Sequence, residues 1–376
     1  MAWSEIEGSG ETGMKVAFLL SRQLRVVAAD TWWLCAAHAA AGWAAWQGWT
    51  LVSGSGILPI DFVCWSYRQH GGAVAPVSIT GAGSNRRERM RDRDRDVIAA
   101  ADVLVGIAIR RGGIMEEEGK RAIRQGKVVH VAVPPFKQKA TFGNFELLNL
   151  GARPLELPEF DCKQAGLVSG TGARTSQKRR SLVFICPDGA SSAQPPADYL
   201  WHYTRACPGP WPGQTPDEYF HSLVQNDPGC GHTGFDTLAR ILAGQKIRAS
   251  GKIIRGQYEV VSFSSAPPED LLARRRFRST LARWDFEPYA VGVRMAAAKA
   301  LGVRPVSYLP SSDFARLSTE DRPFFQRSDE DALDWRHENE WRHIGDFDLS
   351  AMLPADLAAL APSGEAEQLR RLLTRC

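Results

Sequence analysis

The hydrophobic and polar positions of residues 15–135 alternate between short apolar runs and longer helical patterns. The apolar runs predict β-strands at 15–21, 49–56, 73–79, 102–109 and 128–135. Helices are predicted at 26–49, 59–72 and 112–127, and 86–101 is predicted to be a charged loop or the start of a helix. Strands that alternate with helices are typical of an open parallel sheet covered on both faces. Residues 14–136 are therefore predicted to be an α/β domain.

The pattern weakens at 137–197, which is rich in Gly, Ser and Pro and is predicted to be a connector with one strand at 182–186. Further strands are predicted at 199–204, 259–265, 288–295, 304–309 and 338–349, and helices at 235–245 and 269–284. These elements predict a mixed α+β domain over 198–350. Residues 351–376 predict short terminal helices, and the polar residues 1–13 are expected to be disordered.

The bulk composition narrows the class of protein. The chain has 376 residues, which suits two domains better than one core. Its formal net charge of +4 does not require a nucleic acid partner, although it permits an anionic ligand. The seven cysteines form no C-x-x-C pair, which argues against a zinc ribbon or a disulfide framework and suits a reducing cytoplasm. Polar residues interrupt the apolar stretch 26–49, so we expect a buried helix and no membrane association.

Three segments of the first domain fall where parallel sheets bind ligands, near the ends of strands. Two of them place glycine, which lets a phosphate approach the backbone, before a helix start, and the third offers arginines. The residues are Ser53, Gly54, Ser55 and Gly56 with Asp61; Arg93 and Arg95; and Gly112, Gly113 and Glu116. Together they predict a site for a nucleotide phosphate, and the sequence leaves the identity of that nucleotide open.

The segments LVSGSGILPIDFVCWSYRQHGGAV and RDRDVIAAADVLVGIAIRRGGIMEEEGKRAIRQGKVVHVAVPP resemble the SLOG superfamily of Rossmann-like domains. That superfamily includes the DNA-processing protein DprA and the LOG cytokinin-activating enzymes. The positions matching the DprA form are Ser53-Gly54, Ile60-Asp61 and Arg93-Asp94-Arg95, with Pro59 in place of a glycine. Gly112-Gly113 and Glu116 or Glu117 match part of the LOG form, which Ile114-Met115 interrupts. The resemblance implies a nucleotide-binding domain without catalysis, of a kind that often self-associates.

The segment HENEWRHIGD holds the candidate chemistry of the second domain. His337 and His343 are poorly spaced for two zinc ligands on one helix, so no metal site is predicted. As a strand, the segment places Glu338, Glu340 and Arg342 on one face. Two carboxylates on one face suit the binding of a ribose and the stabilisation of an oxocarbenium ion. A solvated edge strand is an equally simple interpretation.

The order WHYT, SFSS and ENEW over 199–349 resembles the ADP-ribosyltransferase superfamily. HYT followed by FDTLARILAGQKIRAS is similar to the opening of the DarT-type nucleic-acid ADP-ribosyltransferases. The resemblance implies NAD as the substrate and a nucleic acid or a protein as the acceptor. The catalytic residues that it implies are Glu340, as the catalytic carboxylate, Glu338, which would orient the acceptor, His202 and Ser264. The NAD contacts that it implies are Tyr203, Thr204 and Ser262.

A basic segment, RRRFRSTLARW, lies between the SFSS and ENEW motifs. As a helix it would carry several arginines around Phe277, namely Arg274, Arg275, Arg276, Arg278 and Arg283. Such a helix suits contacts with nucleic acid phosphates or with the NAD pyrophosphate. A solvated or domain-docking helix has the same pattern.

Three functions are compatible with these features. The first is a bacterial, cytoplasmic defence-type effector, in which the SLOG-like domain senses a nucleotide and controls an NAD-using ADP-ribosyltransferase-like domain. The second is a DprA-like DNA-binding protein without catalysis, and the third is a LOG-like nucleotide phosphoribohydrolase. A homo-oligomer is expected in the first case, because SLOG-like sheets self-associate.

Overall fold

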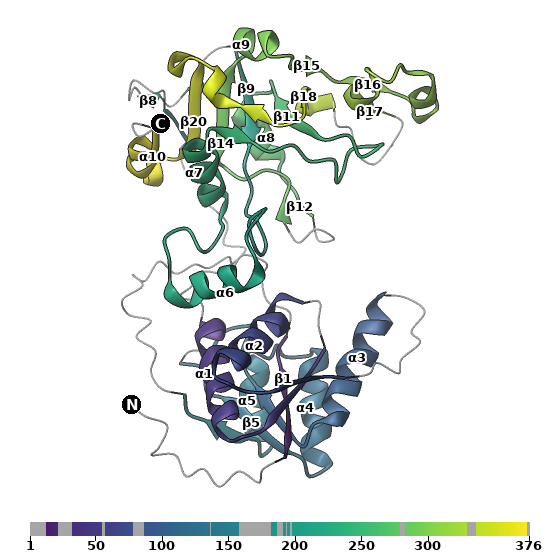
Figure 1. The fold of residues 1–376 in the computed structure, drawn as a ribbon, viewed down its shortest axis with the longest axis vertical. Helices are drawn as coiled ribbons and strands as arrows, with labels where there is room; N and C mark the ends of the chain where they lie inside the picture. The colour runs from purple at the N-terminus through teal and green to yellow at the C-terminus, as the bar shows by residue number, and fades with distance from the viewer. Residues whose placement is uncertain are drawn as a thin grey trace. The chain divides into compact units, whose positions relative to one another are not determined.

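The computed structural model describes residues 13–21, 32–54, 57–77, 86–135, 137–157, 182–185, 191–192, 194–195, 198–278, 283–328 and 336–373. The chain forms two compact units (Figure 1). The first comprises Met1–Ala173 and Gly209–Gly231, and the second comprises Arg174–Pro208 and His232–Cys376. A segment that interrupts the second unit in sequence is therefore part of the first. No helix in the described parts of the chain has the length and apolar character needed to cross a membrane.

The first unit is built on a six-stranded sheet whose strands all pair in parallel. The strands are β1 (Lys15–Leu19), β2 (Thr50–Ser53), β3 (Val74–Pro76), β4 (Val103–Gly106), β5 (Val128–Ala132) and β6 (Arg153–Leu155). Their order, β3-β2-β1-β4-β5-β6, is the Rossmann order. The order reverses between β1 and β4, so the carboxyl ends of these strands are where this fold binds ligands.

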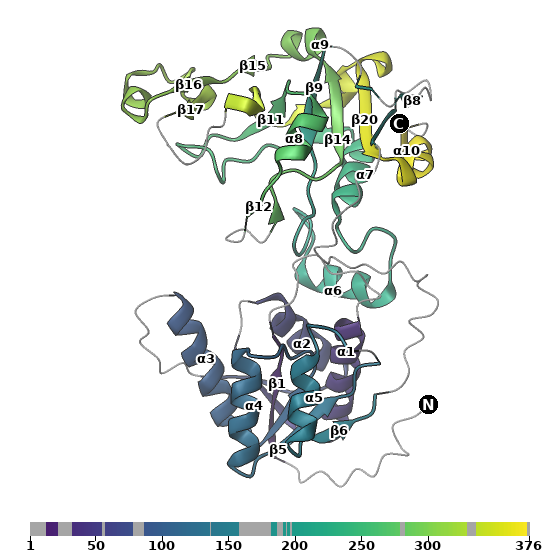
Figure 2. The same ribbon diagram turned by 180° about the vertical axis from the view of Figure 1, so that it is seen from behind.

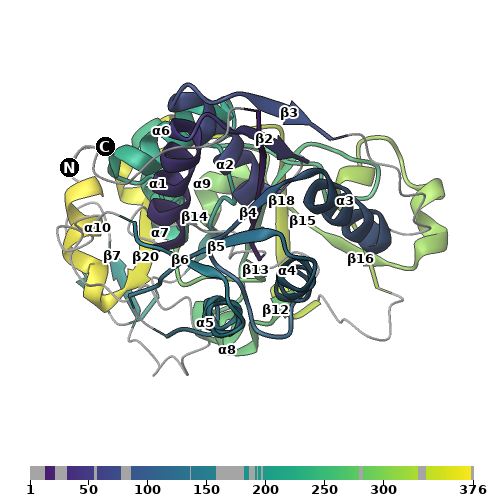
Figure 3. The same ribbon diagram turned by 90° about the horizontal axis from the view of Figure 1, so that it is seen from below.

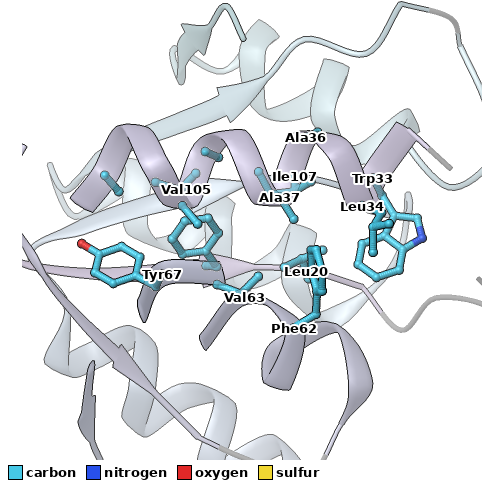
Figure 4. Close-up of a cluster of buried hydrophobic side chains, with 14 of the residues drawn as sticks. Leu20, Trp33, Leu34, Ala36, Ala37, Phe62, Val63, Tyr67, Val105 and Ile107 are labelled. Carbon is cyan, nitrogen blue, oxygen red and sulfur yellow. The ribbon is translucent and has the colours of Figure 1, made fainter. Parts of the chain in front are cut away.

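Helices cover both faces of this sheet, as Figures 2 and 3 show. They are α1 (Trp32–Trp46), α2 (Leu58–Gln69), α3 (Arg86–Ala100), α4 (Ile114–Arg124) and α5 (Phe142–Asn149). Phe18 and Leu20 point from the β1 region into the core under α1 and α2, where Figure 4 shows Leu20 beside Phe62. Ala17 and Leu19 point into the core on the opposite face. Successive side chains of β1 thus pack alternately into the hydrophobic cores on the two faces of the sheet, as expected of a strand covered by helices on both faces.

Two elements of this unit lie in the predicted connector. The short α5 and β6 complete the sheet beyond residue 136, so the unit is longer than the pattern indicated. Asn144 on α5 is fully buried and explains their position. Its Oδ1 accepts from the Ile109 amide at 2.8 Å, and its Nδ2 donates to the carbonyls of Ala132, at 2.9 Å, and Ile107. One side chain therefore satisfies three backbone groups at the ends of β4 and β5.

The segment Gly209–Gly231 contributes α6 (Pro216–Gln225) to the first unit. A capping box between Thr215 and Glu218 starts this helix. Its buried face packs on α2, with the Phe220 ring 5.5 Å from that of Phe62 and 5.8 Å from that of Trp65. The Pro/Gly-rich start of this segment gave no sign of the helix that follows it.

The second unit is built on an eight-stranded sheet whose neighbouring strands pair antiparallel, in the order β15-β18-β11-β9-β14-β20-β7-β8 (Figure 1). The strands are β7 (Leu182–Ile185), β8 (Ser191–Ser192), β9 (Tyr199–Tyr203), β11 (Val260–Ser264), β14 (Ala290–Arg294), β15 (Arg304–Pro305), β18 (Glu340–Ile344) and β20 (Leu357–Pro362). This unit contains the predicted mixture of strands and helices, here around an antiparallel sheet.

Smaller elements surround this sheet. The helices are α7 (Gly234–Gly244), α8 (Pro268–Arg274), α9 (Met295–Ala300) and α10 (Ala366–Leu373). The two-stranded pairs are β10 (Lys246–Ile247) with β19 (Phe347–Asp348), β12 (Phe277–Arg278) with β13 (Arg283–Trp284), and β16 (Ser307–Leu309) with β17 (Phe325–Arg327). Residues of α7 and α10 share a core with Phe263, whereas α8 packs on the opposite face with Trp201.

Two helix predictions in this unit are wrong. The helix predicted over 269–284 ends at Arg274, and the chain then forms the β12–β13 hairpin. The segment LAALAP, predicted to be helical from its Ala and Leu content, is strand β20. Its partners β14 and β7 lie on both sides of it and nearly all of its residues are buried, so tertiary pairing overrides helix propensity here.

Candidate functional site

The sheet of the second unit separates His202 from the other predicted catalytic residues. Ser264 lies opposite Trp201 on β9 and opposite Glu340 on β18. Residues directly opposed across antiparallel strands share a face, and successive residues alternate between faces. Ser264 and Glu340 therefore share the face of Trp201, whereas His202 points to the other face.

His202 has the surroundings of a core residue. Its Nδ1 lies 2.9 Å from the Ser262 carbonyl oxygen, and its ring packs edge-on against Phe263 at 5.8 Å. Burial lowers the pKa of His202 to about 4, with a smaller contribution in the same direction from Arg205. The imidazole is therefore neutral at neutral pH, and the structure does not bring it together with Ser264 and Glu340.

The hydroxyl groups of Ser264, implied as catalytic, and Thr204, implied as an NAD contact, hold the backbone of this region. Ser264 donates to the Glu338 carbonyl at 2.5 Å and accepts from the Ala266 amide at 3.0 Å. Thr204 donates to the Gly234 carbonyl at the start of α7, at 2.7 Å. Ser262 shares the face of Ser264 and lies opposite Arg342. Ser264 and Thr204 thus fix the position of the chain on which the carboxylates are carried.

Glu340 is engaged in an ion pair. Both of its carboxylate oxygens accept from Arg342, each at 2.9 Å. The Arg342 side chain is 2% exposed and that of Glu340 is 14% exposed. A bidentate pair of this kind holds the carboxylate rigidly. Glu340 is therefore a poor candidate for an uncommitted catalytic carboxylate.

Glu338 differs from its predicted position. It ends a 3₁₀ turn, Arg336–Glu338, and Asn339 follows with a φ of +43°, before β18 begins. This left-handed residue breaks the alternation that would place Glu338 on the face of Glu340 and Arg342. Although the residue keeps some exposure, its carboxyl is largely desolvated. Desolvation, which is the larger cause, and the negative charge of the neighbouring Glu340 raise the pKa of Glu338 to about 7.

Charged groups from two other elements act on the Glu338 carboxyl. Arg205, just after β9, and Arg278, on β12, lower its pKa, whereas Asp285 raises it. These three residues are linked, because the Arg205 Nε donates to the Asp285 carbonyl at 2.6 Å and Arg278 pairs with the Asp285 carboxylate at 2.5 Å. We name Glu338, Arg205, Arg278 and Asp285 the Glu338 site. A desolvated carboxyl with a pKa near neutrality, beside arginines, is typical of a functional site.

Two tyrosines border this site. The Tyr308 hydroxyl accepts from the Glu340 amide at 3.0 Å. The Tyr203 hydroxyl is buried and has no hydrogen-bond partner among the described residues, and its ring packs edge-on against Phe286 at 5.1 Å. Arg205, Arg278, Asp285 and Tyr308 had no predicted role in a carboxylate site. The available signals were that Arg205 directly follows the WHYT strand and that Arg278 belongs to the basic segment RRRFRSTLARW.

The basic segment forms a hairpin and therefore has no helical face. Phe277 and Trp284 pair across it, with ring centroids 5.5 Å apart, and the Arg275 guanidinium lies 5.0 Å from the Trp284 ring centre. Arg278 belongs to the Glu338 site through its pair with Asp285. The hairpin thus carries two members of that site.

The first unit has a small hollow at the carboxyl end of β2. It has a volume of about 30 Å³, room for roughly two water molecules. It is lined by Phe18, Leu20, Leu51, Val52, Ser53, Gly54, Ile57, Ile60, Val63, Arg93, Asp94, Val97, Ile98 and Met115. A Cβ on Gly54 would lie 2.7 Å from Arg93 Cδ, so the glycine lets the arginine cross the strand end. Ser53, Gly54 and Arg93 are therefore brought together, and Ser55 and Gly56 lie outside the described residues.

The arginines of this unit come from a helix. Residues 91–96 lie inside α3, so the helix is present and the alternative of a charged loop is not. Arg93 is buried and pairs with Asp94 at 2.6 Å. Arg95 reaches Glu118 on α4, at 3.3 Å. Only Arg93 borders the hollow, and Asp61, in the first turn of α2, is not among its lining residues.

The β4–α4 turn is held by its own glutamates. Gly112 has a φ of +70° and donates its amide to the buried Glu116, which also pairs with Lys120 at 2.5 Å. Gly113 is the N-cap of α4. Glu118 is buried as well and pairs with Arg121 at 2.8 Å in addition to Arg95. The sequence has three consecutive glutamates here and does not show that Glu118 is the one that pairs with another helix. Its partner, Arg95, lies on α3.

No protein-family model and no curated protein matches this sequence. Several solved structures are similar to about two fifths of the chain. DNA processing protein A from Streptococcus pneumoniae is 17% identical over 41% of this chain and 67% of its own, with a TM-score of 0.28. The molybdenum cofactor carrier protein from Chlamydomonas reinhardtii is 17% identical over 39% and 90%, with a TM-score of 0.30. DNA processing protein A from Helicobacter pylori is 16% identical over 41% and 79%, with a TM-score of 0.31. Such low scores carry no inference about function.

Proposed function

We propose that the second unit uses NAD at the Glu338 site, as an ADP-ribosyltransferase or an NAD glycohydrolase. We propose further that the first unit is a SLOG-like domain that binds a nucleotide and controls this reaction. The observation that carries the proposal is the desolvated Glu338 carboxyl, whose pKa is raised by the charge of Glu340 and lowered by the charges of Arg205 and Arg278.

The charges of the site fit NAD better than a purely anionic ligand. Two carboxylates held close together destabilise each other in an empty site, and a cationic group offsets this repulsion. The nicotinamide ring of NAD is such a cation, and the oxocarbenium ion formed from its ribose is another. The pyrophosphate of NAD is an anion and suits Arg205 and Arg278. One ligand would therefore meet both charge types of the site.

The chemistry requires one carboxylate. The bond between the nicotinamide nitrogen and the ribose C1′ breaks, and its electron pair leaves with nicotinamide, which becomes neutral. Ionised Glu338 stabilises the oxocarbenium ion that remains. A water or an acceptor hydroxyl then bonds to C1′, and Glu338 takes the proton that the nucleophile loses. A carboxyl with a pKa near 7 is suited to accepting that proton at neutral pH.

The direct test is nicotinamide release from NAD by the purified full-length protein, followed by chromatography. The wild type is compared with Glu338→Gln and with Glu320→Gln, a change at an exposed glutamate. NAD labelled in the adenylate part distinguishes free ADP-ribose from label attached to added DNA or protein. An absence of turnover by the wild type, with and without AMP, ADP or ATP, would refute the proposal.

Arg93→Gln should weaken nucleotide binding by the first unit at least about tenfold, because a charge-assisted hydrogen bond to phosphate is lost. Calorimetric titration with AMP, ADP and ATP measures this effect on whichever of them binds. Arg316→Gln serves as the control, since Arg316 is 82% exposed and lies in the second unit. Equal affinities for wild type and Arg93→Gln would exclude the hollow beside Gly54 as the nucleotide site.

The segment Gly209–Gly231 belongs to the first unit and is continuous with the second unit at both of its ends. It could therefore transmit the effect of a bound nucleotide from the first unit to the Glu338 site. Helix α2 lines the hollow with Ile60 and Val63, and packs on α6 through Phe62. The residues that flank this segment are hydrogen-bonded, because the Cys207 amide donates to the His232 carbonyl at 2.8 Å. Cys207 is two residues along the chain from Arg205 of the Glu338 site. A shift of α2 on ligand binding would therefore be passed along the chain to Arg205.

Phe220→Leu should loosen α6 and make this coupling measurable. Losing the ring contacts with Phe62 and Trp65 is expected to speed amide hydrogen exchange in α6 about tenfold, and to speed it also at Cys207. Val224→Ala, a change at a partly buried position of the same helix, is the matched control. Faster exchange confined to α6 would argue against transmission through this segment.

A further inference from the structure

Tyr308 reaches the Glu338 site from outside the main sheet. The Val306 amide donates to the Glu340 carbonyl at 3.0 Å, so the chain before β16 runs beside the start of β18. From β16, the Tyr308 hydroxyl turns back and accepts from the Glu340 amide, also at 3.0 Å. Two hydrogen bonds thus fix this tyrosine relative to the carboxylates.

The hydroxyl proton of Tyr308 has no acceptor among the described residues. A phenol accepts and donates, and the one hydrogen bond found at this oxygen uses it as an acceptor. Burial, together with the negative charges of Glu340 and Glu338, raises the pKa of Tyr308 to about 12, against the opposing effects of the hydrogen bond from the Glu340 amide and of Arg342. The phenol is therefore protonated at neutral pH and can donate.

We propose that Tyr308 is a substrate-positioning residue, whose hydroxyl donates to a hydroxyl oxygen of the nicotinamide ribose and holds the sugar against Glu338. Tyr308, Glu338, Arg205 and Arg278 each keep some exposure to solvent. The amide of Glu340 fixes the oxygen on one side and leaves the proton to point elsewhere. This inference rests on the proposed function, because it names the part of NAD that the site grips.

Tyr308→Phe removes the hydroxyl and keeps the ring. We expect KM for NAD to rise about tenfold or more while kcat changes by less than about threefold, because the hydrogen bond acts on bound substrate as well as on the transition state. Tyr258→Phe, at another partly exposed tyrosine of the same unit, is the control. The assay is nicotinamide release by the full-length protein.

Two NAD analogues, lacking either the 2′- or the 3′-hydroxyl of the nicotinamide ribose, separate positioning from a structural role. With one of them, wild type and Tyr308→Phe should have KM values within about threefold, because the partner of the hydroxyl is gone from both. Wild type alone should also bind that analogue about tenfold more weakly than NAD. The second comparison tests the inference even if Tyr308→Phe does not fold.

The outcomes distinguish this inference from the proposed function. If the wild type releases nicotinamide but Tyr308→Phe has an unchanged KM, the inference fails and the proposed function stands. An equal rise in KM for NAD and both analogues would assign Tyr308 a structural role and overturn the inference. If the wild type does not convert NAD, both fail.

Discussion

Glu338→Gln should stabilise the protein at pH 8 by about 3 kcal/mol. The pKa of this carboxyl is raised from 4.5 to about 7 in the folded chain, first by desolvation and then by Glu340. Because the folded state holds the proton more tightly than the unfolded state, the stability from this group is complete below pH 4.5. It is lost as pH rises to about 7, and each pKa unit corresponds to about 1.4 kcal/mol. Glutamine does not ionise and escapes this loss.

Urea denaturation at pH 4.5 and pH 8 measures the effect. The two proteins should differ little at the lower pH, and the difference should appear between pH 4.5 and 7, as the carboxyl of the folded wild type ionises. Glu320→Gln should give no such pH dependence, because that residue is exposed. A wild type that keeps its full stability through this range would show that Glu338 is not desolvated as described.

The same substitution should lower kcat for NAD turnover by roughly 10²–10³-fold, the usual loss when one group that stabilises charge in a transition state is removed. A variant that is both more stable and inactive would identify Glu338 as a residue kept for chemistry at the expense of stability. If Glu338→Gln proved more stable and fully active, the raised pKa would have only a structural meaning.

The local sequence predicts a strand or a helix correctly where a continuous apolar run or one apolar face determines the element. It fails where pairing with segments distant in the chain determines the element. Four of the five predicted strands of the first unit, β1, β2, β4 and β5, are apolar runs inside the parallel sheet with buried residues, and the fifth, β3, is a partly buried edge strand. LAALAP has the composition of a helix, and only its place between β14 and β7 makes it a strand. The relevant contacts lie far away in the chain, so no local window contains them.

The candidate site shows the same limit. Trp201 and His202 alternate along β9, but the relation of either to Ser264 depends on a pairing register that the sequence does not show. Glu338 and Glu340 were expected to share a face, and the left-handed Asn339 prevents this. The kinds of side chain in the site were thus predictable from the sequence. Their arrangement depended on the φ angle of Asn339 and on the pairing of Ser264 with Trp201.

Arg342→Ala should destabilise the second unit by about 3–5 kcal/mol, which is the usual effect of breaking a buried ion pair. All five N–H groups of Arg342 are used. Nε and Nη2 donate to Glu340, Nη1 donates to the carbonyls of Pro323 and Phe325 at 2.9 and 2.8 Å, and Nη2 also donates to Gln326 at 2.8 Å. Removing the side chain leaves the Glu340 carboxylate and two carbonyls without these partners. Arg342→Lys should recover little, because an ammonium has three donors and no fork.

A double-mutant cycle identifies the origin of that loss. Arg342→Met combined with Glu340→Gln removes both charges, so it should be less destabilising than Arg342→Met alone, which leaves the carboxylate unpaired. Arg316→Ala, at a side chain that is 82% exposed, should change the free energy of unfolding by less than about 0.5 kcal/mol. Urea denaturation of the four proteins gives the coupling energy. Additive effects of the two substitutions would mean that Arg342 acts mainly through the carbonyls of Pro323 and Phe325, and that the charge of Glu340 remains available to the Glu338 site.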